Sequence, residues 1–311
     1  LDNDNASMVA EFDVFTLEDT DVDLTVLVNE VPVSNETISL SKGRNQVATK
    51  FNISDPTLWW SAGLGEQYLY DVKVLLQKGR YESTLKDRIG LRTAKWVLND
   101  DSVGTSFYLE LNGVPVFAKG ANYIPNEVIT TAITDEQYEM VIEATLEANM
   151  NMLRVWGGAI YEEKKFYDLC DENGILIWQD FMFACDMMPS TPEMLENIRK
   201  EAIYNVKRLR NHPCITMWCG NNENLRALRE WGWLDNRPEE QVKEIWDGYN
   251  NIYHKILPEA VETYQPDMFY WASSPQSEEG KSSNRIAGDE HDWSIWFGVE
   301  PFESFWNETP R

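Results

Sequence analysis

The strongest constraint on the fold is a change of rhythm near residue 95. Before that point apolar and polar residues alternate in short stretches, and Gly, Pro and Asn turns separate the stretches. Alternation with a period of two is typical of half-buried strands, and short strands at regular spacing favour an antiparallel sandwich. We therefore predict an all-β, immunoglobulin-like sandwich over residues 1–94. Strands are expected at residues 22–28, 34–40, 46–53 and 68–75, with a last strand ending at Ile89.

From about residue 105, strand-like and helix-like segments alternate. Asn112-Gly113 is a hairpin signal, Thr134 to Gln137 form a capping-box pattern, and Asn173-Gly174 is a typical helix end. Alternating strands and helices predict a parallel sheet and a (β/α)₈ TIM barrel. Because the alternation contains about six strands, we expect an incomplete barrel over residues 95–311. The six segments are residues 114–119, 151–156, 175–178, 214–217, 268–272 and 285–288.

Charge and composition exclude several classes of function. The chain has 27 Lys and Arg against 52 Asp and Glu, a net charge of −25. Such a surface repels phosphate backbones and anionic lipids, so we expect neither nucleic-acid nor membrane-surface binding. No apolar stretch approaches the ~18 residues of a membrane span. The four cysteines have no metal-ligand spacing, so no metal or other cofactor is expected. The compartment stays open, with an extracytoplasmic or periplasmic location as the working expectation.

The most informative motif is Trp-Cys-Gly-Asn-Asn-Glu-Asn at residues 218–224. It follows residues 214–217, an apolar run that predicts a short buried strand. A carboxylate just after such a strand lies at the carboxyl rim of a barrel, where catalytic groups of this fold are found. The alternative is an ordinary turn in which Glu223 is merely solvated.

Every predicted strand end in the second half carries a polar or aromatic group, and the chain contains 13 Trp. Flat aromatic faces and a few polar groups are typical of small-ligand pockets, including sugar sites. We therefore predict a sugar-sized polar pocket at this rim. The alternative is that the strand ends are solvated and the tryptophans belong to the core. The groups are Asn122, Arg154, Trp156, Trp178, Gln179, Asp180, Asn222, Glu223, Trp271, His291, Asp292 and Trp293.

Several sequence motifs of this chain together resemble those of glycoside hydrolase family 2. Leu58-Trp59-Trp60, the glycines and Gln67 that follow, and Arg-Ile-Gly-Leu-Arg at residues 88–92 resemble its sandwich-to-barrel junction. Arg-Val-Trp-Gly-Gly at residues 154–158, followed by residues 218–223, resembles the β-mannosidase branch. The resemblance covers nearly the whole chain.

The resemblance implies a retaining, exo-acting β-mannosidase that uses two carboxylates. Glu223 matches the general acid/base, and Asn222 matches an amide that hydrogen-bonds near the sugar 2-hydroxyl. To protonate a leaving group near neutral pH, Glu223 needs a raised pKa, from burial or from the second carboxylate. The expected partners are β-mannoside oligosaccharides or glycoconjugates.

The resemblance also implies roles around these two residues, each with a structural alternative. Trp156 and Trp231 match pocket tryptophans, although either could be core or rim packing. Arg154 could orient the carboxylates or form a salt bridge under the pocket. Asp180 is expected either at the substrate or as a supporting hydrogen bond, and His291 and Trp293 resemble pocket residues.

Two departures from the family pattern qualify this expectation. Phe297 stands where relatives carry Tyr or His, so it cannot donate a hydrogen bond near the nucleophile. The family nucleophile is a Glu in a Ser-Glu-aromatic-Gly word, which is expected just beyond Arg311. We therefore expect this fragment to be inactive, and its open barrel edges to favour pairing between chains.

Two other functions stay open. One is a sister family 2 activity, such as β-galactosidase, β-glucuronidase or exo-glucosaminidase. The other is a carbohydrate-binding protein that does not cleave its ligand.

Overall fold

A computed structural model describes residues 5–277 and 286–307 of the chain, with side chains as far as Ser304. The chain divides into two units, which are described separately. The first contains residues up to 93 together with residues 211–213, and the second contains residues 94–210 and 214–311.

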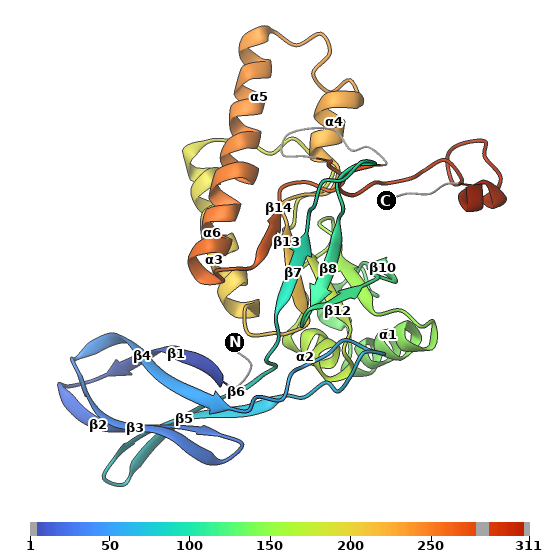
Figure 1. The fold of residues 1–311 in the computed structure, drawn as a ribbon. Coiled ribbons are helices and arrows are strands. Elements are labelled where there is room, and N and C mark those ends of the chain that lie inside the picture. Colours follow the sequence, from blue (N-terminus) through green and yellow to red (C-terminus); the bar gives the residue numbers. More distant parts are fainter. Residues whose placement is uncertain (1–4, 278–285, 308–311) are drawn as a thin grey trace. The chain divides into compact units, whose positions relative to one another are not determined.

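The first unit is a sandwich of two antiparallel sheets (Figure 1). One sheet has the order β1-β4 and the other β3-β2-β5-β6. Apolar residues from both sheets share one core, which includes Leu24, Val26, Phe51, Tyr70 and Val74. The predicted sandwich is therefore confirmed. Its strands are β1 (Asn5–Thr16), β2 (Thr20–Val28), β3 (Val31–Leu40), β4 (Gly43–Ser54), β5 (Tyr70–Lys78) and β6 (Tyr81–Ile89).

The strand β1 was not predicted from the sequence. It pairs with β4 along its whole length, from Asn5 opposite Ser54 to Thr16 opposite Gly43. Only Ala6 in this strand is buried, and the inward-facing residues after it are half-buried. Apolar residues nonetheless occupy every second position from Ala6 to Val14, so the alternation of a half-buried strand is present in the sequence.

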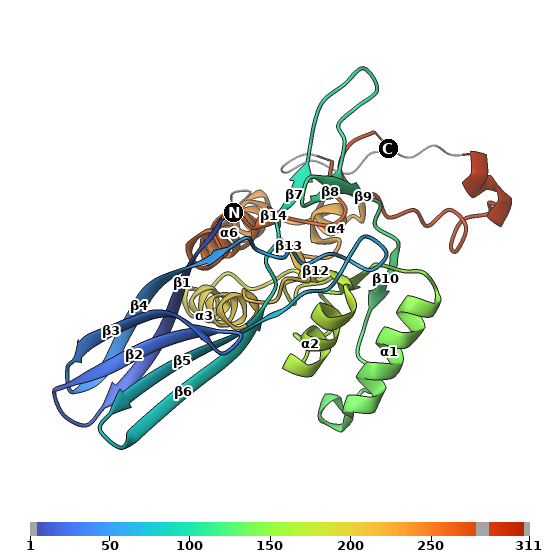
Figure 2. The ribbon, with the colours of Figure 1, turned by 60° about the horizontal axis from the view of Figure 1, so that its bottom comes forward.

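The second unit is built on a parallel sheet of five strands in the order β10-β11-β12-β13-β14 (Figure 2). Helices connect these strands, which confirms the predicted strand–helix alternation. All five residues of β13 are buried, as expected for a parallel strand covered on both faces. The strands are β10 (Gly120–Tyr123), β11 (Met152–Val155), β12 (Leu176–Asp180), β13 (Ile215–Cys219) and β14 (Phe269–Trp271).

Helices pack along the outside of this sheet, with α1 against α2 and α3 against α6. The predicted capping box is present at Thr134, and α2 ends at Gly174 in the left-handed conformation, both as expected. The short helix α4 directly after Glu223 was not predicted. The helices are α1 (Asp135–Glu147), α2 (Lys164–Asn173), α3 (Pro192–Leu209), α4 (Asn224–Glu230), α5 (Glu239–Asn251) and α6 (Leu257–Tyr264); short helical segments are η1 (Thr130–Ala132), the π-helical η2 (Ile252–Ile256) and η3 (Phe302–Asn307).

A separate antiparallel sheet of the order β7-β8-β9 accompanies the parallel one. Its strands are β7 (Ala94–Val97), β8 (Tyr108–Leu111) and β9 (Val114–Val116). Trp96 and Phe107 of this part pack against aromatic rings of β12 and β14, and the Trp96 indole N–H donates to the carbonyl of Thr216 at 3.0 Å. The antiparallel sheet thus fills one side of the parallel sheet with aromatic side chains.

Two expected strands of the second unit were placed wrongly. The hairpin predicted at Asn112-Gly113 is present, because residues 114–116 pair antiparallel with β8; the first parallel strand is therefore not residues 114–119 and begins at Gly120. Residues 286–288 form a turn with a single bridge, while Arg285 lies outside the described residues. Here the Ile286 carbonyl accepts from the Thr105 N–H at 2.8 Å, and Gly288 has a φ of +69°, which lies outside the range of an extended strand.

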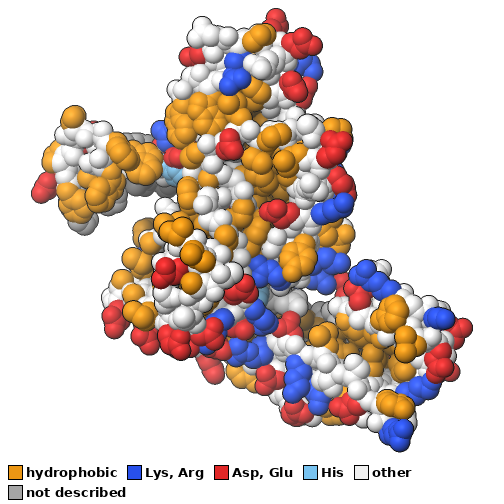
Figure 3. Space-filling view, turned by 180° about the vertical axis from the view of Figure 1, so that it is seen from behind, with side chains coloured by type: hydrophobic (Ala, Val, Ile, Leu, Met, Phe, Trp, Pro, Cys, Tyr) orange, Lys and Arg blue, Asp and Glu red, His pale blue; other side chains and the backbone are white. Residues whose placement is uncertain are grey.

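Acidic, basic and hydrophobic side chains are interspersed on the face shown in Figure 3. Within the described part of the chain, no helix is both long enough and apolar enough to cross a membrane.

The capping box offers a direct test of local stability. In Thr134→Ala the first turn of α1 loses the hydroxyl that accepts from the Gln137 N–H. We expect the free energy of unfolding to fall by about 1 kcal/mol. Denaturant titration of the wild type, Thr134→Ala and the control Thr134→Ser measures this. A Ser variant as unstable as the Ala variant would contradict the capping role.

Candidate active site

The site begins where β13 ends, because the neighbouring strands hold the chain beyond Cys219. Asn222 forms parallel bridges with Ala184 on one side and Ser274 on the other. The Asn222 N–H donates to the Phe183 carbonyl at 2.9 Å, and the Glu223 N–H donates to the Ser274 carbonyl at 2.7 Å. Glu223 itself has a φ of +62°, a left-handed conformation that is uncommon outside glycine. The carboxylate therefore sits on a backbone that is held from both sides.

Buried amides make the turn around Glu223 rigid. The Asn221 Oδ1 accepts from the Asn224 N–H at 3.0 Å and from the Ser273 hydroxyl at 2.7 Å, and its Nδ2 donates to the Ala272 carbonyl at 2.9 Å. At Gly220 a Cβ would lie 2.3 Å from the Ala272 oxygen. Gly220 and Asn221 of the Cys-Gly-Asn-Asn motif thus fit the close contact with Ala272 and Ser273, which follow β14.

A buried ion pair lies beneath the turn. Arg154, near the end of β11, donates two N–H groups to Asp180 at the end of β12, at 3.2 Å from Nε and 2.8 Å from an NH2 nitrogen. The Asp180 side chain is completely buried and also accepts from the Trp178 indole and the Gly157 N–H. Arg154 also lies over the Trp178 ring. The salt bridge expected as one alternative is present, and Asp180 supports the site from below.

The guanidinium of Arg154 also sets the orientation of Asn222. One of its N–H groups donates to the Asn222 Oδ1 at 3.1 Å. Because guanidinium only donates, the amide oxygen must face Arg154 and the amide nitrogen must face the opposite way. That nitrogen lies 3.5 Å from Glu223 Oε2. Asn222 and Glu223, the predicted amide and acid, are therefore brought together.

Three further groups surround the Glu223 carboxylate. His291 Nδ1 lies 2.8 Å from Oε1, the Trp293 indole nitrogen lies 3.4 Å from the same oxygen, and the Cys185 thiol lies 3.5 Å from Oε2. The predicted pocket residues His291 and Trp293 thus contact Glu223 itself.

The pKa of Glu223 is lowered in this setting. Burial is the largest single influence and raises it, but the hydrogen bonds from His291, Trp293 and Cys185, with the electrostatic influence of His291, together outweigh burial. The expectation of a raised pKa is therefore wrong for the chain as it stands. The decisive donor is an imidazole 68 residues further along the chain, which the residues around Glu223 in the sequence do not reveal.

Glu223 opens into a cleft of about 540 Å³. Trp156 is one wall, and its indole packs so closely over Gly158 that a Cβ there would lie 2.1 Å from the ring. The second glycine of the Trp-Gly-Gly word therefore makes room for the indole. The cleft is lined by Asn122, Ile124, Trp156, Cys185, Asn222, Glu223, Glu290, His291, Asp292, Trp293 and Trp296.

Not every predicted site residue reaches this cleft. Trp231 ends α4, is 45% exposed and packs edge-on against Trp233, so it does not line the cleft. Phe297 is also exposed and packs on Trp293, whereas its neighbour Trp296 lines the cleft.

Several residues of the site were missed as functional candidates. Cys185 lines the cleft, and Ser274 and Asp289 lie behind His291. Their only sequence signal was proximity to predicted strand ends, since Cys185 follows Asp180 by five positions and Ser274 follows β14. Asp289 directly follows residues 285–288, which were mistaken for a strand.

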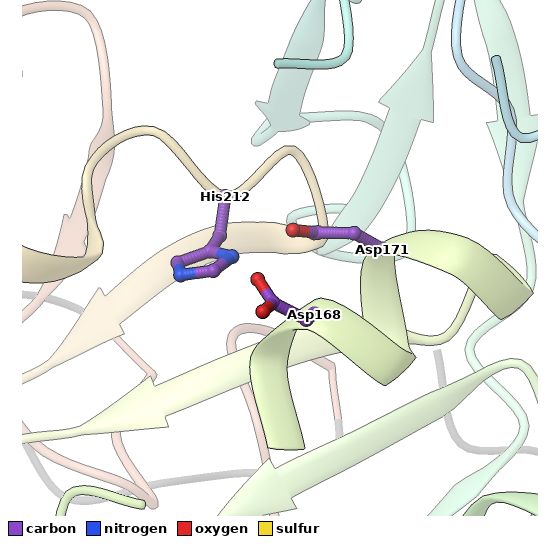
Figure 4. A group of neighbouring side chains, drawn as sticks. All are labelled: Asp168, Asp171 and His212. Carbon is purple, nitrogen blue, oxygen red and sulfur yellow. The ribbon is translucent and has the colours of Figure 1, made fainter. Parts of the chain in front are cut away.

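Away from the cleft, two carboxylates project from one helix, at Asp168 and Asp171 of α2, and His212 lies on the loop before β13 (Figure 4). Both carboxylates already have protein partners. Asp168 pairs with Lys164, and Asp171 accepts the Cys214 N–H at 3.0 Å. These contacts give the helix carboxylates a structural role.

Known proteins resemble this chain over most of its length. The family model for glycosyl hydrolases family 2 matches residues 1–92. A β-mannosidase B of Neosartorya fischeri is 40% identical over 281 residues, which cover 89% of this chain and 33% of that protein. A β-mannosidase B of Aspergillus niger is 36% identical over 96% of this chain and 36% of that protein. The chain spans about a third of the length of these curated relatives.

Solved structures give the same picture. The crystal structure of a β-D-mannosidase from Dictyoglomus thermophilum matches 99% of this chain and 37% of that chain, with a TM-score of 0.86 and 36% identity. An exo-chitosanase of Amycolatopsis orientalis matches 87% of this chain and 30% of that chain, with a TM-score of 0.67 and 20% identity, which is a likeness of fold alone.

The buried ion pair predicts a large loss of stability when only the cation is removed. Arg154→Met leaves the Asp180 carboxylate buried without its partner, so we expect the free energy of unfolding to fall by about 3–5 kcal/mol. The matched control is Arg199→Met, which breaks an exposed pair with Glu259 and should cost about 0–1 kcal/mol. Denaturant unfolding of both variants checks this. If Arg154→Met and Arg199→Met lost equal unfolding free energy, Asp180 would not be left as an uncompensated buried charge in Arg154→Met.

The lowered pKa of Glu223 predicts a pH dependence of stability. An acid whose pKa is lower in the folded than in the unfolded chain stabilises the fold above its unfolded pKa, about 4.3, and loses that contribution as the pH falls through the folded pKa. As the pH falls from 6 to 3, the wild type should therefore lose stability relative to Glu223→Gln. If the wild type instead gained stability relative to the variant as the pH fell, the pKa of Glu223 would be raised and not lowered.

Proposed function

We propose that this chain, which belongs to glycosyl hydrolase family 2, supplies the acid/base side of the active site of a retaining, exo-acting β-mannosidase. The observation that carries the proposal is the position of Glu223. Its carboxylate opens into an aromatic-walled cleft at a strand end, in a chain about 40% identical to β-mannosidases B.

The proposed reaction is a double displacement. Glu223 donates its proton to the glycosidic oxygen while a second carboxylate attacks the anomeric carbon, so the C–O bond breaks as a glycosyl-enzyme bond forms. Glu223, now ionised, then removes a proton from water, and the hydroxyl displaces the second carboxylate to release the sugar. Each step conserves protons, because Glu223 ends the cycle protonated as it began.

We infer that the second carboxylate comes from a part of the protein outside this chain. The sequence contains no Ser-Glu-aromatic-Gly word. Glu290 and Asp292 line the cleft, but Glu290 pairs with Arg226 at 3.4 Å and neither has the family context. A carboxylate placed near Glu223 would also raise its pKa, since a like charge disfavours ionisation. The lowered pKa found here then belongs to the acid/base without its partner.

The surrounding residues have proposed roles in binding. Asn222 presents its amide nitrogen beside Glu223, where it can donate to the sugar hydroxyl next to the anomeric carbon. The Trp156 and Trp293 rings offer flat faces for the C–H faces of a mannosyl ring. Trp231 is not proposed as a contact of this cleft.

One observation favours a second function for the chain by itself. With its pKa lowered, Glu223 is ionised near neutral pH and cannot act as an acid, whereas the aromatic cleft remains able to hold a sugar. The chain alone would then be a carbohydrate-binding unit that does not cleave its ligand.

Hydrolysis of aryl glycosides tests both ideas. The 311-residue chain should not hydrolyse p-nitrophenyl β-mannoside above the buffer rate. A longer form of the protein that includes the missing carboxylate should hydrolyse it, and faster than the β-galactoside, β-glucuronide and β-glucosaminide. In that form Glu223→Gln should reduce the rate by about 10²–10⁴-fold.

Two outcomes would sink the proposal. Brisk turnover by the 311-residue chain that Glu223→Gln abolishes would place the nucleophile inside it. A longer form that binds mannosides without cleaving any of the four substrates would favour the binding protein.

A further inference from the structure

We propose that Asp289, Ser274 and His291 form a hydrogen-bonded relay through which a proton moves between Asp289 and Glu223. The relay assigns Asp289 and Ser274 a positioning role that neither has so far. Its use in catalysis rests on the proposed function, but its existence does not.

The relay is a continuous chain of short contacts. The Ser274 hydroxyl lies 2.5 Å from Asp289 Oδ2 and 3.0 Å from His291 Nε2, and His291 Nδ1 lies 2.8 Å from Glu223 Oε1. Every link is within hydrogen-bond distance, and each middle group can both donate and accept. The two carboxylates at the ends are therefore joined by a hydroxyl and an imidazole.

The backbone brings these distant segments together. At Gly288 a Cβ would lie 1.9 Å from the Gln276 carbonyl oxygen, so only glycine permits this approach. The Asp289 N–H donates to the same carbonyl. On the other side, the Ser274 carbonyl accepts the Glu223 N–H. Ser274 is thus held between the residue that bears the acid and the segment that bears His291.

Arg154 selects the resting arrangement of protons. One of its NH1 hydrogens faces His291 Nε2 at 3.2 Å, and a guanidinium can only donate. Nε2 must therefore present its lone pair, and the imidazole proton must be on Nδ1, where it is donated to an ionised Glu223. With Asp289 ionised, the Ser274 hydroxyl donates to Asp289 Oδ2; in the proposed resting state Asp289 is protonated and donates to the Ser274 oxygen, and the hydroxyl turns to Nε2.

The other contacts of Asp289 fix which of its oxygens can carry a proton. Its Oδ1 accepts from the Trp271 indole at 2.7 Å and from the Gln276 N–H at 2.9 Å, so a proton on this carboxyl belongs on Oδ2, facing Ser274. Burial raises the pKa of Asp289, against the hydrogen bonds that its ionised form accepts from Ser274, Gln276 and Trp271 and against the electrostatic influence of His291. The same structure lowers the pKa of Glu223.

The transfer step moves three protons in one direction. Asp289 Oδ2 gives its proton to the Ser274 oxygen, Ser274 gives its own to His291 Nε2, and His291 Nδ1 gives its own to Glu223 Oε1. Three O–H or N–H bonds break and three form, and the net charge stays constant. Glu223 becomes the protonated acid that the proposed reaction needs, and Asp289 becomes the carboxylate.

Other charged groups face the relay and bias it. Arg154 opposes the proton on Nε2 and so favours the resting state, while Asp180 beneath it balances the guanidinium charge. Cys185 contacts the far oxygen of Glu223, and Arg226 donates to the His291 carbonyl. A second carboxylate near Glu223 would favour the transferred state, because it disfavours the ionised form of Glu223.

Nitrogen NMR of the 311-residue chain tests the relay without any catalytic assay. The chain has only three His, so ¹⁵N-histidine labelling gives a simple spectrum in which His291→Gln identifies the signal. In the neutral imidazole of His291 the proton should be on Nδ1. In Ser274→Ala the Nε2 resonance should move toward that of a nitrogen without a hydroxyl donor. In Asp289→Asn it should stay, since the amide oxygen remains with Trp271 and the amide nitrogen donates to Ser274.

The controls separate the relay from a general disturbance. Ser106→Ala lies outside the relay and should leave all three histidine signals unchanged, and His212 and His254 should not respond to Ser274→Ala. A proton on Nε2 in the wild type would overturn the proposal. An Nε2 resonance unaffected by Ser274→Ala would also overturn it, and if that variant fails to fold, the Asp289→Asn spectrum decides.

A pH profile in the longer, active form tests the use of the relay. Asp289→Asn locks the resting arrangement, so the alkaline limb of kcat/KM should move to lower pH, whereas a merely structural role would lower kcat/KM without moving the limb. If the NMR result holds and the longer form cleaves no mannoside, the proposed function fails and the relay stands. If the longer form is active and the limb does not move, the relay has no part in catalysis.

Discussion

The site depends on one buried cation. Asp180 balances the charge of Arg154 beneath the cleft. Other N–H groups of the same guanidinium face the residues around Glu223. One of them turns the Asn222 amide, and another requires a lone pair on His291 Nε2. Because guanidinium is planar and can only donate, a single side chain sets both the amide orientation and the imidazole tautomer beside Glu223. A lysine in its place would offer a point charge with none of this geometry.

Local features of the fold could be predicted from the sequence because they depend on neighbouring residues. The capping box at Thr134, the left-handed Gly174 and the buried strand before the Cys-Gly-Asn-Asn word are all set within a few positions. The strand β1 was missed although its apolar residues alternate with period two, and residues 286–288 were mistaken for a strand because a short apolar run resembles one. The hydrophobic pattern of a sequence indicates which residues are buried. It does not distinguish a strand from a turn that is held in place by hydrogen bonds to distant parts of the chain.

The candidate site was predictable in its members more than in its chemistry. Asn222, Glu223, Trp156, His291 and Trp293 meet at one cleft, as expected from strand ends that share a rim. The direction of the Glu223 pKa was not predictable, because it depends on donors from three separate segments. Trp231 shows the converse error, since a tryptophan one helix away from Glu223 packs on Trp233 instead of entering the cleft.

The left-handed backbone conformation of Glu223 costs conformational free energy, which interactions elsewhere in the fold must offset. Most residues with a Cβ are strained at a φ of +62°, whereas glycine, which has no Cβ, and asparagine, whose short polar side chain can hydrogen-bond locally, adopt it more readily. Replacement by either would relax the turn and at the same time remove the carboxylate. Selection for thermal stability alone would therefore tend to discard this glutamate. Its persistence in a working enzyme would mark a position where chemistry outweighs folding.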